Sequence, residues 1–418
     1  MAYEANPRTP AGVSIALARS DAARIFLSSR ALVAVVAIFA ALSFGPAAGG
    51  LAARNAAKFD VPALTHPFGG FGDVTLSPLA RWDAVWFLRI ADEGYADSEP
   101  RAAFFPLYPM LVRTVGELGG GSRGALLIAA YAVSLAAFLG ALVLLQRLAA
   151  LEIGERAARA AVLLLAFFPA AVYFGAPYSE SLFLLVSVGA FYAARTEHWA
   201  WAGACAACAA ATRSAGILLL VPLALLWLGG RRRPVDAAWL LLAPAGLAAY
   251  ALYLGLAEGD ALRFLDVQDA WYRHFAGPLG GAWDGLAAAV DGARQLLSGS
   301  RVPVYFTEAA GDPFRIGALN VMLFGFLCFA IVACVGAFRR LGAAYGAWVA
   351  VALALPLSFP VTPQPLMSLP RFLSVLFPIF MWLGLVCEER RITDRVAAVS
   401  AVGLGLFTAQ FATWHWIS

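Results

Sequence analysis

Long apolar runs separated by short polar loops dominate the chain of 418 residues. About 20 consecutive apolar residues can cross the hydrocarbon core as a helix, whose backbone polar groups are hydrogen-bonded within the segment. The runs that suit such a span are 31–50, 124–146, 159–175, 178–194, 199–228, 236–256, 317–338, 343–359, 371–387 and 395–414. This pattern predicts an all-α polytopic membrane protein with about 10 or 11 transmembrane segments.

Composition supports the membrane class, because 61% of the residues are hydrophobic and only 13% are charged. A soluble domain carries roughly 25% charged residues. The net charge of +4 is too small to indicate a nucleic-acid partner. Cys205 and Cys208 have the spacing of a redox or zinc motif, but neither a second pair nor a nearby histidine completes one. We therefore expect buried thiols and no disulfide framework.

Two long connections, 51–123 and 257–316, interrupt the apolar runs and mix aromatic residues, charges, glycine and proline. The first run is too long for a signal-peptide core, so we interpret 31–50 as an uncleaved span. Residues 1–30 are then a cytoplasmic tail, and residues 31–418 form a single transmembrane domain. Lys and Arg concentrate in short cytoplasmic loops. Both long connections are accordingly predicted to face outward.

The run 199–228 conflicts with this topology if it crosses the membrane once. A single crossing would place Arg231–Arg233 and every later basic cluster on the outer side. The conflict disappears if the run enters and returns as a hairpin that breaks at Thr212–Gly216, its only polar interruption. An arginine at membrane depth usually faces a polar cavity. The charge pattern therefore predicts a cavity at Arg213.

The segment 81–109, RWDAVWFLRIADEGYADSEPRAAFFPLYP, places a carboxylate among aromatic and basic residues at the outer membrane surface. On a helical wheel, Asp83 lies between Trp86 and Phe87. An acid beside lipid is costly unless something requires it. Two interpretations fit, namely an amphipathic helix on lipid with a solvated Asp83, and an active-site loop with Asp83 as general base.

Three further outward elements each allow a structural and a functional interpretation. The FFPLYP motif around Tyr108 suits a membrane anchor or a wall of a lipid or sugar site. Glu180 either charges a helix N-terminus or binds hydroxyl groups. Arg371 runs against the positive-inside trend, so it either snorkels to the interface or binds a phosphate bidentately.

The second long connection contains Gln268, close to Trp271, Tyr272, Arg273 and His274. The lone histidine is weak evidence for a site. The sequence contains no HExxH, GxSxG, Walker or GxGxxG motif. Because the best site holds a single acid and no Asp-x-Asp is present, neither a metal nor a cofactor is indicated.

In order, the motifs RWDAVWFL…GY, FFPLYP, FFPA…APYSESLF, ATRSAG and LPRF resemble the GPI mannosyltransferase II (PIG-V type) family over about residues 78–385. The chain looks like a bacterial member. The resemblance implies a GT-C fold with a catalytic first outer loop, and a polyprenyl-phosphate-linked mannose donor used on the non-cytoplasmic side. The family's catalytic acid matches Asp83. A bacterium is not expected to make the GPI precursor, so the acceptor, a lipid or a glycan, stays unidentified.

This chemistry gives each candidate residue a role. A glycosyl phosphate carries its own leaving group, so the enzyme needs a base, cations for the phosphate and aromatic walls. Asp83 is the expected base of a single, inverting displacement. An internal ion pair with Glu180 is the alternative role for Arg213. The substrate-binding candidates are Arg213 and Arg371 for phosphate, Glu180 for hydroxyl groups, and Trp82, Tyr108 and Tyr178 as walls, together with Arg81 and Gln268.

Two other functions stay open, a lipid or sugar transporter and a GT-C transferase with a different lipid-linked sugar. A transporter needs broken or polar helices near the midplane and often has internal repeats. Arg213 marks one break, but the sequence contains no convincing repeat. For the transferase we expect a multi-pass protein of the cell membrane, surrounded by membrane lipids, with its active site on the extracytoplasmic face.

Overall fold

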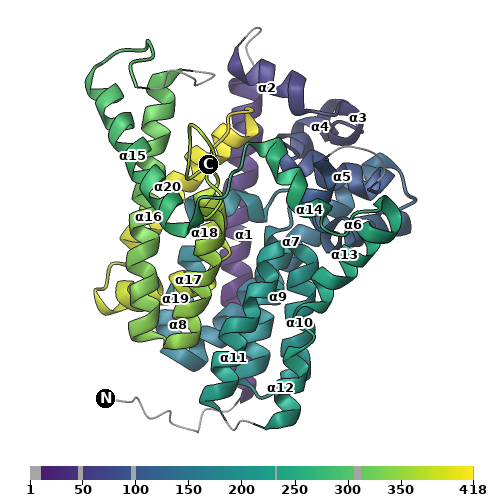
Figure 1. The fold of residues 1–418 in the computed structure, drawn as a ribbon, viewed down its shortest axis with the longest axis vertical. Coiled ribbons are helices and arrows are strands. Elements are labelled where there is room, and N and C mark those ends of the chain that lie inside the picture. Colours follow the sequence, from purple (N-terminus) through teal and green to yellow (C-terminus); the bar gives the residue numbers. More distant parts are fainter. Residues whose placement is uncertain (1–10, 46–49, 96–99, 231–232, 306–311, 418) are drawn as a thin grey trace.

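The computed structural model describes residues 11–45, 50–95, 100–230, 233–305 and 312–417, and they form a bundle of helices (Figure 1). These residues contain no β-strand beyond one isolated bridge. Among them, the helices long and apolar enough to cross a membrane are Asp21–Ser43, Arg123–Ile153, Pro234–Glu258, Pro313–Arg340 and Thr393–Ala412. The prediction of an all-α polytopic membrane protein is confirmed.

Most predicted apolar runs correspond to helices, although several are interrupted. The first span is displaced: α1 (Ala11–Ser43) begins before the expected 31–50 and ends before Pro46, which disfavours helical backbone at Gly45. Residues 1–10 of the expected tail lie outside the described residues. The other uninterrupted spans are α7 (Arg123–Ile153), α16 (Pro313–Arg340), α17 (Ala343–Leu357) and α20 (Thr393–Ala412).

The predicted span 236–256 divides at a turn over 241–244 into α12 (Pro234–Leu240) and α13 (Ala245–Glu258). Three further interruptions of the predicted spans lie at the site end of the helices. The first break separates α8 (Glu155–Ala166) from α9 (Glu180–Arg195), with the 3₁₀ turn η3 (Pro169–Phe174) between them. Another separates α18 (Leu369–Ser374) from α19 (Phe377–Glu389). Proline at the start of η3, α18 and α19 explains these breaks, since it cannot donate the hydrogen bond that would continue a helix.

The third break is at Arg213 and makes the hairpin that the charge pattern predicts. Helix α10 (Trp199–Thr212) ends at extended backbone, and η4 (Ser214–Leu219) leads into α11 (Leu220–Gly229). A β-carbon at Gly216 would lie 2.1 Å from the carbonyl carbon of Ala209, so glycine alone allows η4 to fold back against α10.

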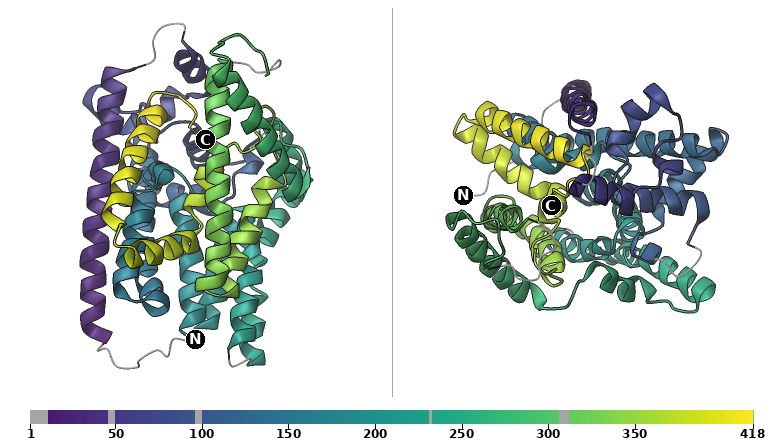
Figure 2. Two further views of the ribbon diagram at one scale, coloured as in Figure 1. Left: turned by 90° about the vertical axis from the view of Figure 1, so that its left-hand side faces the viewer. Right: turned by 90° about the horizontal axis from the view of Figure 1, so that it is seen from above.

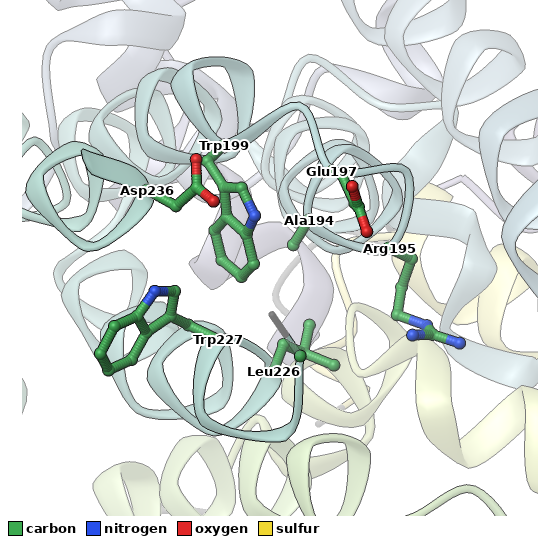
Figure 3. A pocket seen from close by; sticks show the side chains of 8 residues that line it. Ala194, Arg195, Glu197, Trp199, Leu226, Trp227 and Asp236 are labelled. Carbon is green, nitrogen blue, oxygen red and sulfur yellow. The ribbon is translucent and has the colours of Figure 1, made fainter. Parts of the chain in front are cut away.

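The two ends of this segment meet at one place. Trp199, at the start of α10, and Leu226 and Trp227, near the end of α11, line the same pocket (Figure 3). Arg195 and Asp236, which flank the segment in the sequence, line it too (Figure 3). The segment therefore reverses direction at Arg213, which is the backbone path that the predicted hairpin requires.

Both long connections lie at the same end of the molecule (Figures 1 and 2). Rings of the two connections touch there, since Phe104 and Trp271 have centroids 5.8 Å apart. Basic loops gather at the opposite end, where Arg340 pairs with Glu389. The helices of the first connection are α2 (Leu51–Phe59), α3 (Pro62–Thr65), α4 (Gly70–Leu76), η1 (Ser77–Leu79), α5 (Asp83–Glu93), η2 (Pro100–Ala103) and α6 (Leu107–Leu118). Those of the second are α14 (Arg263–Asp266), η5 (Val267–Trp271) and α15 (Gly277–Leu297).

The hairpin can be tested by side-specific labelling of single cysteines in an otherwise cysteine-free chain. We expect His198→Cys and Val235→Cys to react with an impermeant maleimide from the same side of the membrane, because both ends of the segment line one pocket. Leu297→Cys, in the second connection, is 88% exposed and should react from the other side. Labelling of the first two variants from opposite sides would establish a single crossing.

Candidate active site

Asp83 is the first residue of α5, and the backbone before it is strained. Trp82 has φ 57° and ψ −120°, a region that bulky residues rarely adopt. The Tyr178 hydroxyl, which has no exposed surface, secures this turn. It accepts a hydrogen bond from the Asp83 amide at 3.0 Å and donates one to the Arg81 carbonyl at 3.0 Å. Tyr178 therefore fixes the position from which the Asp83 carboxylate projects.

Arg371 joins the Asp83 carboxylate to a second acid. Its Nη1 lies 2.5 Å from Oδ2 of Asp83, and its Nε donates to Oε1 of Glu180. The same Glu180 oxygen accepts a hydrogen bond from Nη1 of Arg213. Four chain segments that are distant in the sequence thus converge on one ion-pair network. The alternative in which Arg213 pairs with Glu180 is confirmed.

The two acids of this network differ in exposure. The Glu180 side chain is completely buried, whereas 18% of the Asp83 side chain is exposed. Within the described residues, Oδ1 of Asp83 has no hydrogen-bond donor. Glu180 is thus placed to anchor the two arginines, and Asp83 is the acid that a substrate can reach.

One oxygen of Glu180 lacks a partner. Oε2 is buried and accepts no hydrogen bond from the described residues. A buried acceptor without a donor is unfavourable, so a hydroxyl group or a water molecule is expected beside it.

Aromatic rings surround the two arginines. The guanidinium carbon of Arg371 lies 4.8 Å from the ring centroid of Tyr178 and 5.1 Å from that of Tyr173. Arg213 lies 5.7 Å from the ring of Phe372. These cation–π contacts hold both planar groups in place where little water can reach them.

Arg273, which the sequence interpretation left out of the site, is close enough to interact electrostatically with these groups. Burial lowers the pKa of its guanidinium, the Asp83 carboxylate opposes that change, and the positive charges of Arg371 and Arg213 reinforce it. The signal that singled out Arg371, an arginine against the positive-inside trend, also applied to Arg273. The site therefore contains three guanidinium groups and two carboxylates.

Arg81 and Trp82 adjoin Asp83 in the chain but belong to a neighbouring cluster. Arg81 pairs with Asp60 at 3.6 Å and lies over the ring of Trp414. The Trp82 ring has its centroid 5.3 Å from that of Trp414 and 4.9 Å from that of Trp416. The strained backbone at Trp82 separates the two clusters, because it directs the side chains of Arg81 and Trp82 to one side and that of Asp83 to the other.

Two other candidates have structural contacts. Tyr108 has no exposed surface, and its hydroxyl lies 3.0 Å from the Ala130 carbonyl oxygen and 2.8 Å from the Ser134 hydroxyl. It supports α5 from behind, since its ring centroid lies 5.0 Å from that of Phe87. Gln268 donates to the Phe264 carbonyl at 3.2 Å, within its own turn.

Comparison with known proteins shows similarity to one family over part of the chain. Residues 22–227 match the family model described as Mannosyltransferase (PIG-V). The chain is 33% identical to GPI mannosyltransferase 2 of Drosophila melanogaster over 120 residues, covering 27% of this chain and 26% of the relative. It is 36% identical to GPI alpha-1,6-mannosyltransferase 2 of Mus musculus over 153 residues, covering 35% of this chain and 31% of the relative. The alignments thus span only about a quarter to a third of these relatives' length.

Solved structures show weaker likeness. ArnT from Cupriavidus metallidurans bound to undecaprenyl phosphate aligns with TM-score 0.38 and 18% identity, covering 78% of this chain and 71% of that one. The archaeal oligosaccharyltransferase AglB from Archaeoglobus fulgidus, in complex with an inhibitory peptide and a dolichol-phosphate, aligns with TM-score 0.41 and 14% identity, covering 94% and 56%. TM-scores this low do not establish a common fold.

The network predicts that Glu180 matters more for stability than Asp83. Glu180→Ala would leave Arg371 and Arg213 without their shared buried partner, a change of about 3–5 kcal/mol. We expect a clear loss of thermal stability, measured by fluorescence-detected size-exclusion chromatography after heating. Asp83→Asn should have a smaller effect. Glu117→Ala is the control, because the Glu117 side chain is 60% exposed. Equal melting temperatures for Glu180→Ala and Glu117→Ala would contradict the prediction.

Proposed function

We propose that the chain, which matches the mannosyltransferase (PIG-V) family model over residues 22–227, is a membrane glycosyltransferase. It moves a hexosyl residue, with mannose as the first candidate, from a polyprenyl-phosphate-linked donor to a lipid or glycan acceptor. The reaction takes place on the extracytoplasmic face of the cell membrane. The observation that carries this proposal is the reachable Asp83 carboxylate held by Arg371 in a cation-rich, aromatic site.

Asp83 acts as the base in this proposal. Arg371 holds Oδ2, and Oδ1 is left to accept the proton of the acceptor hydroxyl. The hydroxyl oxygen forms a bond to the anomeric carbon as the bond from that carbon to the phosphate oxygen breaks. The electron pair of the broken bond leaves with the polyprenyl phosphate, and the proton passes to Asp83. The displacement occurs in one step, so the anomeric centre is inverted.

The charges of the site suit a donor linked through a single phosphate. The site contains three guanidinium groups, those of Arg213, Arg371 and Arg273, and the two carboxylates of Asp83 and Glu180. Its net charge is therefore three minus two, or +1. A glycosyl polyprenyl phosphate is a phosphodiester with one negative charge, so it neutralises this excess. Negative charge on the phosphate grows as the sugar leaves, and fixed guanidinium groups stabilise it most in a site that excludes water.

The proposal predicts that Asp83→Asn abolishes transfer of labelled mannose from polyprenyl-phosphate mannose. We expect a loss of at least about 100-fold, since a positioned general base contributes roughly 10²–10⁴-fold. The assay uses membranes with equal amounts of each variant and counts label in acceptor fractions.

Asp92→Asn is the matched control for this assay. Asp92 lies on the same helix and pairs with Arg123 at 2.9 Å, away from the site. Its removal should leave transfer close to that of the wild type. Equal transfer by Asp83→Asn and wild type would exclude Asp83 as the base. A wild-type chain that moves the lipid-linked sugar across vesicles without transferring it would favour the transporter instead.

Arg371→Lys offers a second test, because it keeps the charge but not the shape. The guanidinium reaches Asp83 and Glu180 through two different nitrogens, whereas an ammonium group cannot hold both acids in this geometry. We expect transfer to fall by about 10- to 100-fold, with the main loss in kcat. A variant with wild-type kcat would show that the bridge is not needed for catalysis.

A further inference from the structure

Arg273 is placed by an unusual piece of backbone in the second connection. It pairs with Val361 in an isolated antiparallel bridge, and the Ala276 amide donates to the Ser358 carbonyl at 2.9 Å. The preceding residue, Tyr272, has φ 56°, a value that glycine and asparagine adopt readily but a tyrosine rarely does. Such strain persists only where the surroundings enforce it, and it is frequent at ligand sites. The bridge fixes Arg273 against the segment that leads into α18 and Arg371.

The guanidinium of Arg273 differs from the two other arginines of the site. Arg213 and Arg371 are both paired with carboxylates. In the part of the chain that the structure describes, the Arg273 side chain makes no hydrogen bond or ion pair, although it is half-buried. A half-buried cation without a partner is unfavourable unless water or a ligand satisfies it. The charges acting on it are those of Asp83, Arg371 and Arg213.

We propose that Arg273 directly binds the phosphate group of the lipid-linked donor. This assignment rests on the proposed function and changes the roles within it. Arg213 becomes a positioning residue that holds Glu180, and the cation that meets the phosphate comes from the second connection. A guanidinium presents two parallel N–H groups to a phosphate, which fixes the orientation of the group as well as its position.

The placement also orients the sugar. A phosphate held between Arg273 and Arg371 lies beside Asp83, so the anomeric carbon attached to it lies within reach of a hydroxyl that Asp83 deprotonates. The polyprenyl chain then extends toward the apolar helices. Two kinds of lipid could supply the phosphate group that Arg273 binds. One is the polyprenyl phosphate of the donor, and the other is the headgroup of an anionic phospholipid.

The test is the affinity of the purified full chain for decaprenyl phosphate, measured by thermophoresis in detergent, together with donor KM and kcat. We expect Arg273→Gln to weaken binding by about 10- to 100-fold and to raise the donor KM similarly. The kcat value should fall as well, because Arg273 would also stabilise the negative charge that grows on the phosphate as the sugar leaves. Arg273→Lys should recover part of the affinity. Arg294→Gln is the matched control, since Arg294 is in the same connection with its side chain 59% exposed.

The outcomes separate this assignment from the proposed function. Unchanged decaprenyl phosphate binding in Arg273→Gln overturns the assignment, whether or not hexosyl transfer is detected. Lost binding in this variant, with a wild-type chain that binds the lipid but transfers no sugar, supports the phosphate site and rejects the transferase. If phosphatidylglycerol displaces bound decaprenyl phosphate as effectively as free decaprenyl phosphate does, the donor-specific assignment is overturned. If Arg273→Gln does not fold, Arg273→Lys decides. An affinity of Arg273→Lys equal to that of the wild type, or an equal loss of affinity in the control Arg294→Gln, then overturns the assignment.

Discussion

The bridge from Asp83 through Arg371 to Glu180 is the interaction on which the rest of the site depends. Both ends are carboxylates, and the one at the buried end also receives Arg213. Buried ion pairs contribute little net stability, because removing charges from water offsets their attraction. Their effect here is geometric: loss of Glu180 would leave Arg213 without an acid, and loss of Arg371 would leave Asp83 without a cation. The position of Asp83 is therefore determined by residues far from it in the sequence.

Broken helices put this network where it is. Glu180 opens α9 after the break at η3, Arg213 follows the end of α10, and Arg371 belongs to the short α18 before the next break. Interrupted backbone inside a membrane must be buried in protein or line a cavity, because lipid cannot satisfy its polar groups. Breaks in neighbouring spans thus tend to gather. Here the same places supply polar backbone and charged side chains to one site.

The sequence predicted the spans and the hairpin, because both follow from hydrophobic length and from the distribution of arginine. It also predicted Asp83, Tyr178, Glu180, Arg213 and Arg371, which the structure brings together. It could not predict that Arg81 turns toward Asp60, since that direction follows from the strained backbone at Trp82. Nor could it predict which arginine stays unpaired, because ion pairing depends on tertiary contacts between distant segments.

The role of the second connection follows from this pairing. Arg213 and Arg371 are each committed to an acid, so the excess charge of the site comes from the second connection, which an antiparallel bridge joins to the segment before α18. An anion bound there would contact Arg273 on one side and the Asp83–Arg371 pair on the other. Its binding energy would then hold this connection in place, and the connection would in turn keep water away from the reacting groups. Electrostatic stabilisation is strongest where water is excluded. Donor binding and assembly of the catalytic site are in this view one event.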